Sequence, residues 1–429
     1  MAEPFGLSPS LWAATAPPAA PTPPLREDRS VDVCVIGGGY LGLSAALRLA
    51  ERGQEVAVLE AREPGWGGSG RNGGQVIPGI KYDPRDLADK VGAEAAQALA
   101  AFVGSTADLV FDLIETHGMD VPRARAGWVQ GAHTSAALET VKARVEDWRA
   151  RGVAAQLLDR TQTQDRLGTS QYVGGWFDPR GGAVQPLAYA RGLARAAMAA
   201  GASIHGESPV VSLKREAETW VARTASGASL RARRVIMGTG GYTGDLIANL
   251  RQTIIAPNSF IVATEPLTAN LRESVMAGGI VSSDTRQLLL YFRQDHEGRL
   301  LMGGRGPFRE PTGPQDWAHL ERVLGKMFPQ VGATPIAYRW CGRVALTRDF
   351  LPHLHEPEPG LLIDIGCMGR GVGLQTAMGR AMADHVASGG RDALPFAVSK
   401  ITPLPLHGLH RAYISALIAW YRLTDGGVR

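Results

Sequence analysis

Three glycines near the N-terminus have the spacing of a phosphate-binding turn. Gly37, Gly39 and Gly42 follow residues 31–36, a short β-branched run typical of a buried strand. In such a turn the first glycine makes the bend, the second lets backbone amides approach a pyrophosphate, and the third lets a helix pack closely on the strand. The spacing therefore predicts a site for a phosphate-bearing nucleotide.

The residues after this turn complete a strand, helix and strand unit. Residues 43–53 favour a helix, and residues 56–60 form a second apolar run that ends at Glu60. An acidic side chain at that point would accept hydrogen bonds from the ribose hydroxyls of an adenosine. The complete pattern predicts a βαβ unit for the ADP half of NAD or FAD, and an incidental glycine turn is the alternative.

A second glycine-rich loop favours FAD over NAD. Residues 65–75 contain six glycines around Arg71 and Asn72, so the backbone can approach a ligand that extends beyond its phosphates. A nicotinamide dinucleotide gives no obvious reason for this loop. The alternative is a flexible surface loop.

A third loop, residues 369–373, precedes a helix-forming run over residues 374–386. The positive end of that helix would stabilise the negative charge of a reduced flavin ring. From the residues alone, the loop serves equally well as a site for another anion.

These segments resemble the D-amino-acid-oxidase-like flavoproteins, and within them the branch of γ-glutamylputrescine oxidases and bacterial L-pipecolate oxidases. The resemblance covers nearly the whole chain and is carried by residues 33–46, 65–75, 234–242, 339–352 and 366–379. It implies FAD-dependent oxidation of a C–N bond in an amine, amino acid or imino acid, by hydride transfer to flavin that leaves an imine. O2 or a quinone would then accept the electrons.

The motifs and the resemblance together predict the cofactor contacts. Val210 and Val211 are included because this strand resembles the family segment whose backbone pairs with adenine. The predicted contacts are Gly37, Gly39, Tyr40, Leu41, Gly42, Glu60, Ala61, Arg62, Ser69, Arg71, Asn72, Gly73, Gly74, Gln75, Val210, Val211, Gly238, Thr239, Gly240, Gly369, Arg370, Gly371, Val372 and Gly373.

Some relatives link flavin covalently through an N-terminal histidine or a cysteine near the flavin. No histidine precedes Leu113 here, and Cys341 is followed by Gly342 in place of the linking pattern. We therefore expect non-covalent FAD.

A predicted hairpin supplies the candidates for substrate positioning. Residues 288–293 and 299–305 read as two strands around a turn at residues 296–298. Arg293 and Arg305 could each hold a substrate carboxylate with paired donors, and Tyr291 could orient the substrate or close the site. Solvated ion pairs for the arginines, and core packing for the tyrosine, are the alternatives. No histidine or carboxylate stands out as a base.

These motifs require an α/β fold. We expect a Rossmann-like FAD-binding domain of the glutathione-reductase type, interleaved with an α+β substrate domain that contains an antiparallel sheet. The expected FAD-binding domain comprises residues 31–84, 145–245 and 335–399, and the substrate domain comprises residues 85–144, including one long helix over 86–118, and residues 246–334. Residues 1–30 read as an extended Pro-rich arm and residues 400–429 as a helical segment.

Composition sets the remaining expectations. The chain has 429 residues, 45% apolar and 20% charged, with a net charge of +4 that is too small and dispersed to indicate nucleic-acid binding. Three cysteines without CxxC spacing predict neither disulfides nor a metal site, which fits the cytoplasm. No run is long enough to cross a bilayer. We expect the apolar C-terminal helix to pack on the domain, with a membrane-surface helix as the alternative.

Other enzyme classes fit less well. A flavin monooxygenase would carry a Gly-Asp segment near the C-terminus, where this chain has Gly366, Cys367 and Met368. An NAD-dependent dehydrogenase leaves the later glycine loops unexplained. A quinone-linked amino-acid dehydrogenase and a non-catalytic flavin-binding protein remain as alternatives.

Overall fold

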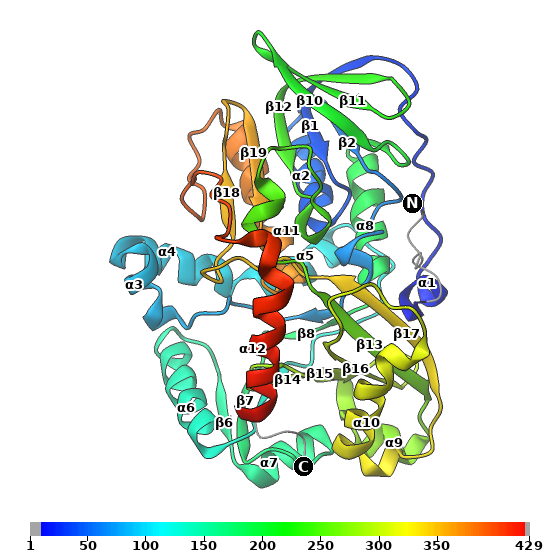
Figure 1. The fold of residues 1–429 in the computed structure, drawn as a ribbon, viewed down its shortest axis with the longest axis vertical. Coiled ribbons are helices and arrows are strands. Elements are labelled where there is room, and N and C mark those ends of the chain that lie inside the picture. The colour runs from blue at the N-terminus through cyan, green and yellow to red at the C-terminus, as the bar shows by residue number, and fades with distance from the viewer. Residues whose placement is uncertain (1–9, 425–429) are drawn as a thin grey trace.

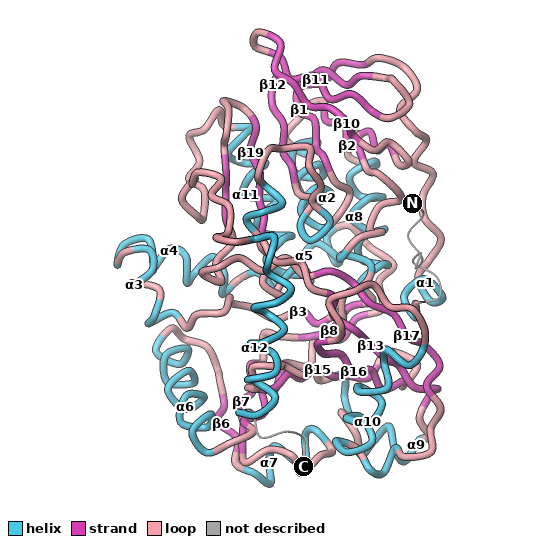
Figure 2. The backbone as a smooth tube through the Cα atoms, viewed as in Figure 1, coloured by secondary structure: helices cyan, strands magenta, loops and turns pink. Residues whose placement is uncertain are grey.

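The computed structural model describes residues 10–424, with side chains through Tyr421 (Figure 1). Two large sheets lie at opposite ends of the molecule, with helices packed beside each of them (Figure 2). A three-stranded sheet consists of β3 (Gln75–Val76), β8 (Gly182–Val184) and β4 (Arg123–Ala124). This arrangement confirms the predicted α/β fold.

The first sheet contains the predicted nucleotide unit. Its parallel centre is β9 (Ser203–His205), β2 (Val56–Leu59), β1 (Arg29–Ile36), β12 (Ser229–Met237) and β19 (Leu361–Ile365). The antiparallel strands at its margins are β10 (Val210–Glu216), β11 (Thr219–Thr224) and β18 (His353–His355). The helices α2 (Tyr40–Glu51), α8 (Pro186–Ala199) and α11 (Gly371–Ala387) pack together in the largest apolar core. As predicted, the glycine turn connects β1 to α2, and β2 follows.

The second sheet is mostly antiparallel. In order it contains β17 (Ile336–Arg343), β13 (Asn258–Pro266), β16 (Arg299–Arg305), β15 (Tyr291–Gln294), β14 (Val281–Asp284), β5 (Trp128–Ala132), β7 (Gly174–Asp178) and β6 (Gln156–Leu158). Around it lie α6 (Ser135–Ala150), α7 (Arg160–Leu167), α9 (Ala269–Ser274) and α10 (Ala318–Met327) (Figure 1). The predicted hairpin is present as β15 and β16.

Several elements correct the expected division of the chain. β6 and β7 lie in the second sheet, although residues 145–245 were expected in the FAD-binding domain, and β17 also lies there, although residues 335–399 were expected in that domain. Short strands carry no sequence signal for which of two sheets they join. We propose a division that follows the sheets.

The expected long helix over residues 86–118 is also wrong. It is divided into α3 (Ala88–Val91), α4 (Ala93–Gly104) and α5 (Thr106–Thr116), with Gly92 at φ 85° between the first two. The buried side chains of α4 and α5 pack in the core of α2 and α11, not with the second sheet. The apolar surfaces of α4 and α5 are therefore buried in the half of the molecule that contains the predicted nucleotide unit.

The N-terminal arm packs along the half of the molecule that contains the first sheet. Residues 16–28 are extended as predicted, and Arg191 Nη1 donates to the Pro17 carbonyl at 2.7 Å. Residues 11–15 differ from the prediction, because they form α1 (Leu11–Thr15), whose buried Trp12 packs against Trp340 at a 5.6 Å centroid distance. Residues 1–9 of the expected arm lie outside the described residues.

The chain ends with α12 (His410–Thr424), which crosses the front of the second sheet (Figure 1). Within residues 10–424, no single helix is long and apolar enough to span a membrane. The bent pair α4 and α5 meets the criteria of length and composition.

Candidate active site

One cavity of about 1380 Å³ is lined by residues of both large sheets. Small-molecule pockets are usually about 300–1,000 Å³, so this cavity has room for an extended ligand with a second molecule beside it. It begins at Glu60 and Val210 beside the first sheet and reaches Trp128 and Trp176 of the second. Apolar α12 residues, including Ile414, close it on the outer side.

The nucleotide end of the cavity is built from backbone. Gly37 has φ +107°, and a Cβ there would stand 2.7 Å from the Gly238 carbonyl oxygen, so only glycine fits this close approach. Gly39 precedes α2 without a side-chain cap, and although the Tyr40 N–H donates to Ser69 Oγ, the next N–H groups at the helix start are available to an anion. This narrow glycine-lined channel fits a pyrophosphate.

Glu60 lies where the ribose contact was predicted. Its two carboxylate oxygens accept hydrogen bonds from the backbone of Gly38 at 2.6 Å and of Arg62 at 2.9 Å. Burial raises the pKa of Glu60, while these backbone bonds oppose the rise. The side chain is thereby fixed at the cavity wall.

The second glycine loop is folded by its own side chains. Ser69 Oγ accepts from the backbone N–H of Tyr40 at 2.9 Å. Asn72 Nδ2 donates to the Ser69 carbonyl at 2.9 Å, and its Oδ1 accepts from the backbone of Gly74 at 2.8 Å. Gln75 ties the loop to the second sheet through the Ser282 carbonyl at 2.9 Å. These bonds fix the loop at the cavity wall.

Most of the predicted cofactor residues line the cavity. They are Gly37, Gly39, Tyr40, Leu41, Glu60, Ala61, Arg62, Ser69, Arg71, Asn72, Gly73, Gln75, Val210, Val211, Gly238, Thr239, Gly240, Gly369, Arg370, Gly371 and Val372. Direct contact with cofactor remains a prediction for them.

Three of the predicted glycines do not line the cavity. A Cβ on Gly42 would lie 1.9 Å from the Gly37 carbonyl oxygen, so Gly42 has the packing role that its spacing predicts. Gly74 lies against the Val184 carbonyl, and Gly373 lies against Thr106 of α5. Each of these glycines serves chain packing, and direct contact with FAD stays a prediction for them.

Arg370 connects the cofactor loop to the second sheet. Its side chain lines the cavity, with the guanidinium carbon 4.7 Å from the centroid of the Trp128 ring. Its Nη1 is buried and has no hydrogen-bond partner among the described residues. Burial, with a smaller contribution from Arg144, lowers the pKa of Arg370 to about 10. Arg370 was predicted as a cofactor residue, and its charged end lies beside Trp128 of the second sheet.

Arg293 does not reach the cavity, which corrects its predicted role as a carboxylate clamp. Its Nε and Nη2 donate to the carbonyls of Gly73 at 2.8 Å and Val184 at 2.9 Å. It shares a face of β15 with Tyr291, but lies two residues further along, where the glycine loop and Trp12 cover it. Burial lowers its pKa to about 10.

The other two substrate candidates do line the cavity. Tyr291 shares a hydrogen bond of 2.9 Å with Ser259, and burial raises its pKa to about 12, so it keeps its proton at neutral pH. Burial lowers the pKa of Arg305, which occupies the same wall.

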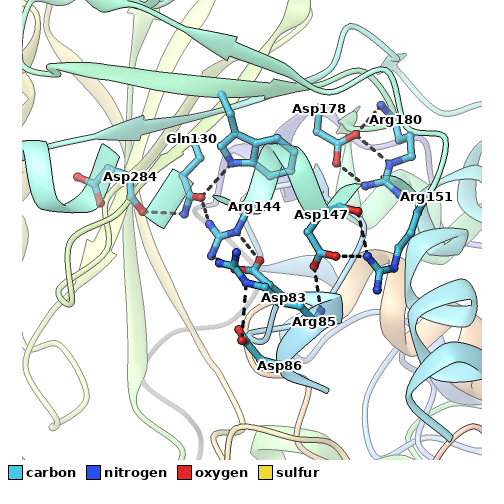
Figure 3. Close-up of polar contacts among 11 residues, drawn as sticks. Asp83, Arg85, Asp86, Gln130, Arg144, Asp147, Arg151, Asp178, Arg180 and Asp284 are labelled. Atoms are coloured by element: carbon cyan, nitrogen blue, oxygen red, sulfur yellow. Dashed lines mark hydrogen bonds and ion pairs between the residues drawn. The ribbon is translucent and has the colours of Figure 1, made fainter. Parts of the chain in front are cut away.

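The polar and charged side chains at the far end of the cavity were not predicted from the sequence (Figure 3). Arg144 Nε pairs with Asp83 Oδ1 at 2.5 Å, and Trp176 Nε1 donates to Gln130 Oε1 at 3.1 Å. Lys81 also lines this end, and burial with the nearby Arg370 and Arg144 lowers its pKa. These residues come from separate segments, and no spacing pattern brings them together.

The charges at this end do not balance. Asp83 is paired with Arg144, whereas Lys81 and Arg370 have no ion pair to a carboxylate among the described residues. Lys81 is exposed at this end and Arg370 is half-buried with a buried Nη1, and two cations without a carboxylate partner suit a ligand that brings its own negative charge.

The fold and the site define an α/β oxidoreductase that uses a dinucleotide cofactor. The family model described as FAD dependent oxidoreductase matches residues 32–385, so the chain belongs to this family of FAD-dependent enzymes. The chain is 33% identical to a probable oxidoreductase OrdL of Haemophilus influenzae, over 85% of this chain and 84% of that protein. It is 31% identical to the γ-glutamylputrescine oxidoreductase of Escherichia coli, over 97% of this chain and 98% of that protein.

Solved structures share the fold. Glycine oxidase of Geobacillus kaustophilus superposes with a TM-score of 0.72 at 21% identity, covering 86% of this chain and 99% of that one. L-proline dehydrogenase of P. horikoshii superposes with a TM-score of 0.69 at 20% identity, covering 94% and 100%. The predicted family, fold and FAD cofactor are therefore confirmed.

Proposed function

We propose that this enzyme oxidises a C–N bond in an amine or amino acid that also carries a carboxylate. The observation that carries the proposal is the pair of unbalanced cations, Lys81 and Arg370, at the end of the cavity beyond the cofactor loops. The similarity to γ-glutamylputrescine oxidoreductase along almost the whole chain supports this substrate class.

Two kinds of substrate meet this description. One is a γ-glutamylputrescine-like amine, and the other is an L-pipecolate-like imino acid. Both have a carboxylate for the cationic end and a C–N bond to oxidise, so the charge pattern alone favours neither.

Arg370 would bind the carboxylate and thereby orient the C–N bond. Its planar fork matches a carboxylate with paired donors. When bound, FAD supplies the hydride acceptor for the oxidation of the amine to an imine. The amine must be neutral for this transfer. The positive charges of Lys81 and Arg370 lower the pKa of a nearby substrate ammonium and so favour its neutral form.

The aromatic residues exclude water around this position. Trp128 and Trp176 meet edge to face with centroids 5.2 Å apart, and both line the cavity. Tyr291, which stays protonated, would donate a hydrogen bond to the substrate. No histidine among the described residues lines the cavity. Orientation and charge, with no dedicated base, are therefore the proposed contributions of the chain.

We also propose that FAD binds without a covalent link. Cys341 is buried on β17 and does not line the cavity, and the absence of a lining histidine supports the same conclusion. Release of intact FAD on acid precipitation would agree with it, and flavin retained on the denatured chain would contradict it.

The proposed reaction is tested by anaerobic spectra of the purified flavoprotein. The substrates are γ-glutamylputrescine, L-pipecolate, L-proline, sarcosine and D-amino acids, each mixed separately with the enzyme. We expect loss of the flavin absorption band with a carboxylate-bearing amine. An unchanged spectrum with every compound, despite bound FAD, would favour the non-catalytic alternative.

The electron acceptor is distinguished in the same enzyme. Reoxidation of the reduced protein by air, with peroxide formed, identifies an oxidase. Slow reaction with air and rapid reaction with a quinone analogue identify the quinone-linked dehydrogenase.

A further inference from the structure

One bulky residue at the cavity wall has a strained backbone. Phe350 lies in the loop of residues 344–352 between β17 and β18, and its φ is 59°. This left-handed conformation is rare for a bulky apolar residue, because its Cβ lies too close to the backbone. The Phe350 ring is also 42% exposed, and it lines the cavity. Backbone strain of this kind is retained mostly at active sites and ligand contacts.

Hydrogen bonds hold this loop on both sides of Phe350. Tyr82 Oη donates to the Asp349 carbonyl at 2.6 Å. The Asp349 carboxylate accepts hydrogen bonds from the backbone N–H of Leu351 at 3.1 Å and from His353 Nε2 at 3.0 Å. The strained backbone of Phe350 is therefore fixed by its neighbours, and an exposed aromatic ring is kept at the cavity wall.

The loop of Phe350 contacts both segments that carry a cation without a carboxylate partner. Lys81 Nζ is 5.6 Å from the centroid of the Phe350 ring. The backbone N–H of Thr347 donates to Met368 Sδ at 3.3 Å, two residues before Arg370. The ring is thus placed beside the position proposed for the substrate carboxylate. The carbon atoms next to a carboxylate bound there would face an apolar surface.

We infer that Phe350 determines specificity for the hydrocarbon part of the substrate. The inference rests on the proposed function and concerns the same cavity. The Phe350 ring packs against the apolar carbon atoms that adjoin the carboxylate, and the gain in binding comes from the apolar area removed from water. The favoured class is an amino or imino acid with several CH2 groups near its carboxylate, such as L-pipecolate. Sarcosine has a carboxylate and a secondary amine but lacks this carbon frame.

Carboxylates that cannot be oxidised as amines test the role of the ring separately from the reaction. Cyclohexanecarboxylate has the six-membered ring and carboxylate of L-pipecolate without the amine, and acetate has the carboxylate with one methyl group. Calorimetric titration of the FAD-loaded enzyme gives a Kd for each. We expect cyclohexanecarboxylate to bind the wild type at least about tenfold more tightly than acetate. Phe350→Ala should weaken cyclohexanecarboxylate about tenfold and acetate less than about twofold.

The ratio of the two affinities separates this role from others. If the Phe350 ring acted only by holding Lys81, Phe350→Ala would weaken both carboxylates equally, and that result would overturn the inference. Unchanged binding of both carboxylates in Phe350→Ala would refute the inference and leave the proposed function standing. Binding of neither carboxylate to the wild type would contradict the proposed carboxylate site itself, and the inference with it.

Three further variants control for folding and strain. Phe350→Gly removes the same ring but accepts a φ of 59° without strain, so it should lose cyclohexanecarboxylate binding like Phe350→Ala and unfold at a higher urea concentration. Ala217→Gly relieves a similar φ of 54° in the turn between β10 and β11, and Leu157→Ala removes an exposed leucine of β6. Neither Ala217 nor Leu157 lines the cavity, so both variants should bind the carboxylates like the wild type. A loss in either as large as in Phe350→Ala would contradict the assignment.

Discussion

The hydrogen-bond partners of two arginines indicate which one is placed to bind ligand and which one stabilises the fold. Arg293 is buried and Arg370 is half-buried, and burial lowers the pKa of each to about 10. Arg293 has its donors on backbone carbonyls, whereas Arg370 has a buried nitrogen without a partner at the cavity wall. The same side chain type therefore has two different roles, and the hydrogen bonds reveal which is which.

Replacing Arg370 should weaken binding of the substrate carboxylate. For Arg370→Met we expect KM for L-pipecolate or γ-glutamylputrescine to rise roughly 10–100-fold, the effect of losing a charged hydrogen bond. KM for piperidine or putrescine, which lack the carboxylate, should change little. Arg370→Lys should recover part of the loss. Steady-state kinetics check this, and an equal rise for acids and simple amines would contradict the assignment.

Replacing Arg293 should affect stability. Arg293→Met leaves the buried carbonyls of Gly73 and Val184 without donors, and each loss costs about 1–3 kcal/mol. Urea denaturation should show this decrease in the free energy of unfolding. Arg305→Met is the matched control, because Arg305 lines the cavity and should change stability little. Equal stability of the two variants would refute the structural role of Arg293.

Asp364 should make stability fall as the pH rises. Its carboxylate is buried, and burial raises its pKa from 3.8 to about 7, against a smaller opposing effect of the neighbouring Gln375 side chain. The folded state therefore holds a proton that the unfolded state has released between these pH values. The stabilising protonated form is fully present below pH 3.8, and the contribution is lost as the pH approaches 7.

The Asp364→Asn variant tests this dependence. We expect it to remove a fall in stability of up to about 1.4 kcal/mol per pH unit over that window, measured by denaturation at several pH values. Asp112→Asn, at an exposed position of α5, should keep the wild-type slope. A wild-type slope in the Asp364 variant would assign the pH dependence to other groups.

At the scale of elements, α2 and α11 must approach closely for the cofactor loops to meet. A Cβ on Gly379 of α11 would lie 2.2 Å from the Leu41 carbonyl oxygen of α2. Leu41 lines the cavity, and the start of α11 carries Gly371 and Val372, which line it too. The spacing of the two helices therefore sets the width of the site.

Gly379→Ala should separate these helices. We expect a loss of about 1–3 kcal/mol in stability and weaker FAD binding, measured by denaturation and by the flavin to protein absorbance ratio. Gly325→Ala in α10 is the control, because a Cβ there meets nothing within 4 Å. That control should gain about 0.5–1 kcal/mol. A Gly379→Ala variant with wild-type stability and wild-type flavin content would show that FAD binding does not require this close helix packing.

The sequence predicted those elements whose signals are local. The strand, glycine turn and helix around Gly37 are encoded within a few residues, and so is the β15 and β16 hairpin. The assignment of β7 and β17 to the second sheet depends on partners far along the chain, so local patterns placed them wrongly. Tyr291 and Arg293 were both predicted to position the substrate, but the sequence could not show that the glycine loop and Trp12 cover Arg293.

At the scale of the whole molecule, the cavity makes the two sheets one binding unit. Residues of the first sheet hold the nucleotide end, whereas Trp128, Gln130 and Trp176 of the second form the far end. The sequence could not predict this far end, since Lys81, Arg144 and Arg370 meet only in the folded chain.

FAD binding should therefore protect both halves. A hundredfold excess of FAD over its Kd stabilises the folded state by about 2.7 kcal/mol. Hydrogen exchange should slow in residues 37–42 beside the first sheet and also in the cavity-lining parts of β5 and β15 in the second sheet. Protection limited to the first sheet would mean that the cofactor does not reach the second.

Four tryptophans, Trp66, Trp128, Trp148 and Trp176, line the same cavity as the cofactor loops. Indole emission overlaps the absorption of oxidised flavin, so excitation energy can pass from these rings to a bound flavin. Tryptophan fluorescence should therefore report whether FAD is bound. The emission excited by ultraviolet light should decrease when FAD binds and increase when it leaves, without any added dye.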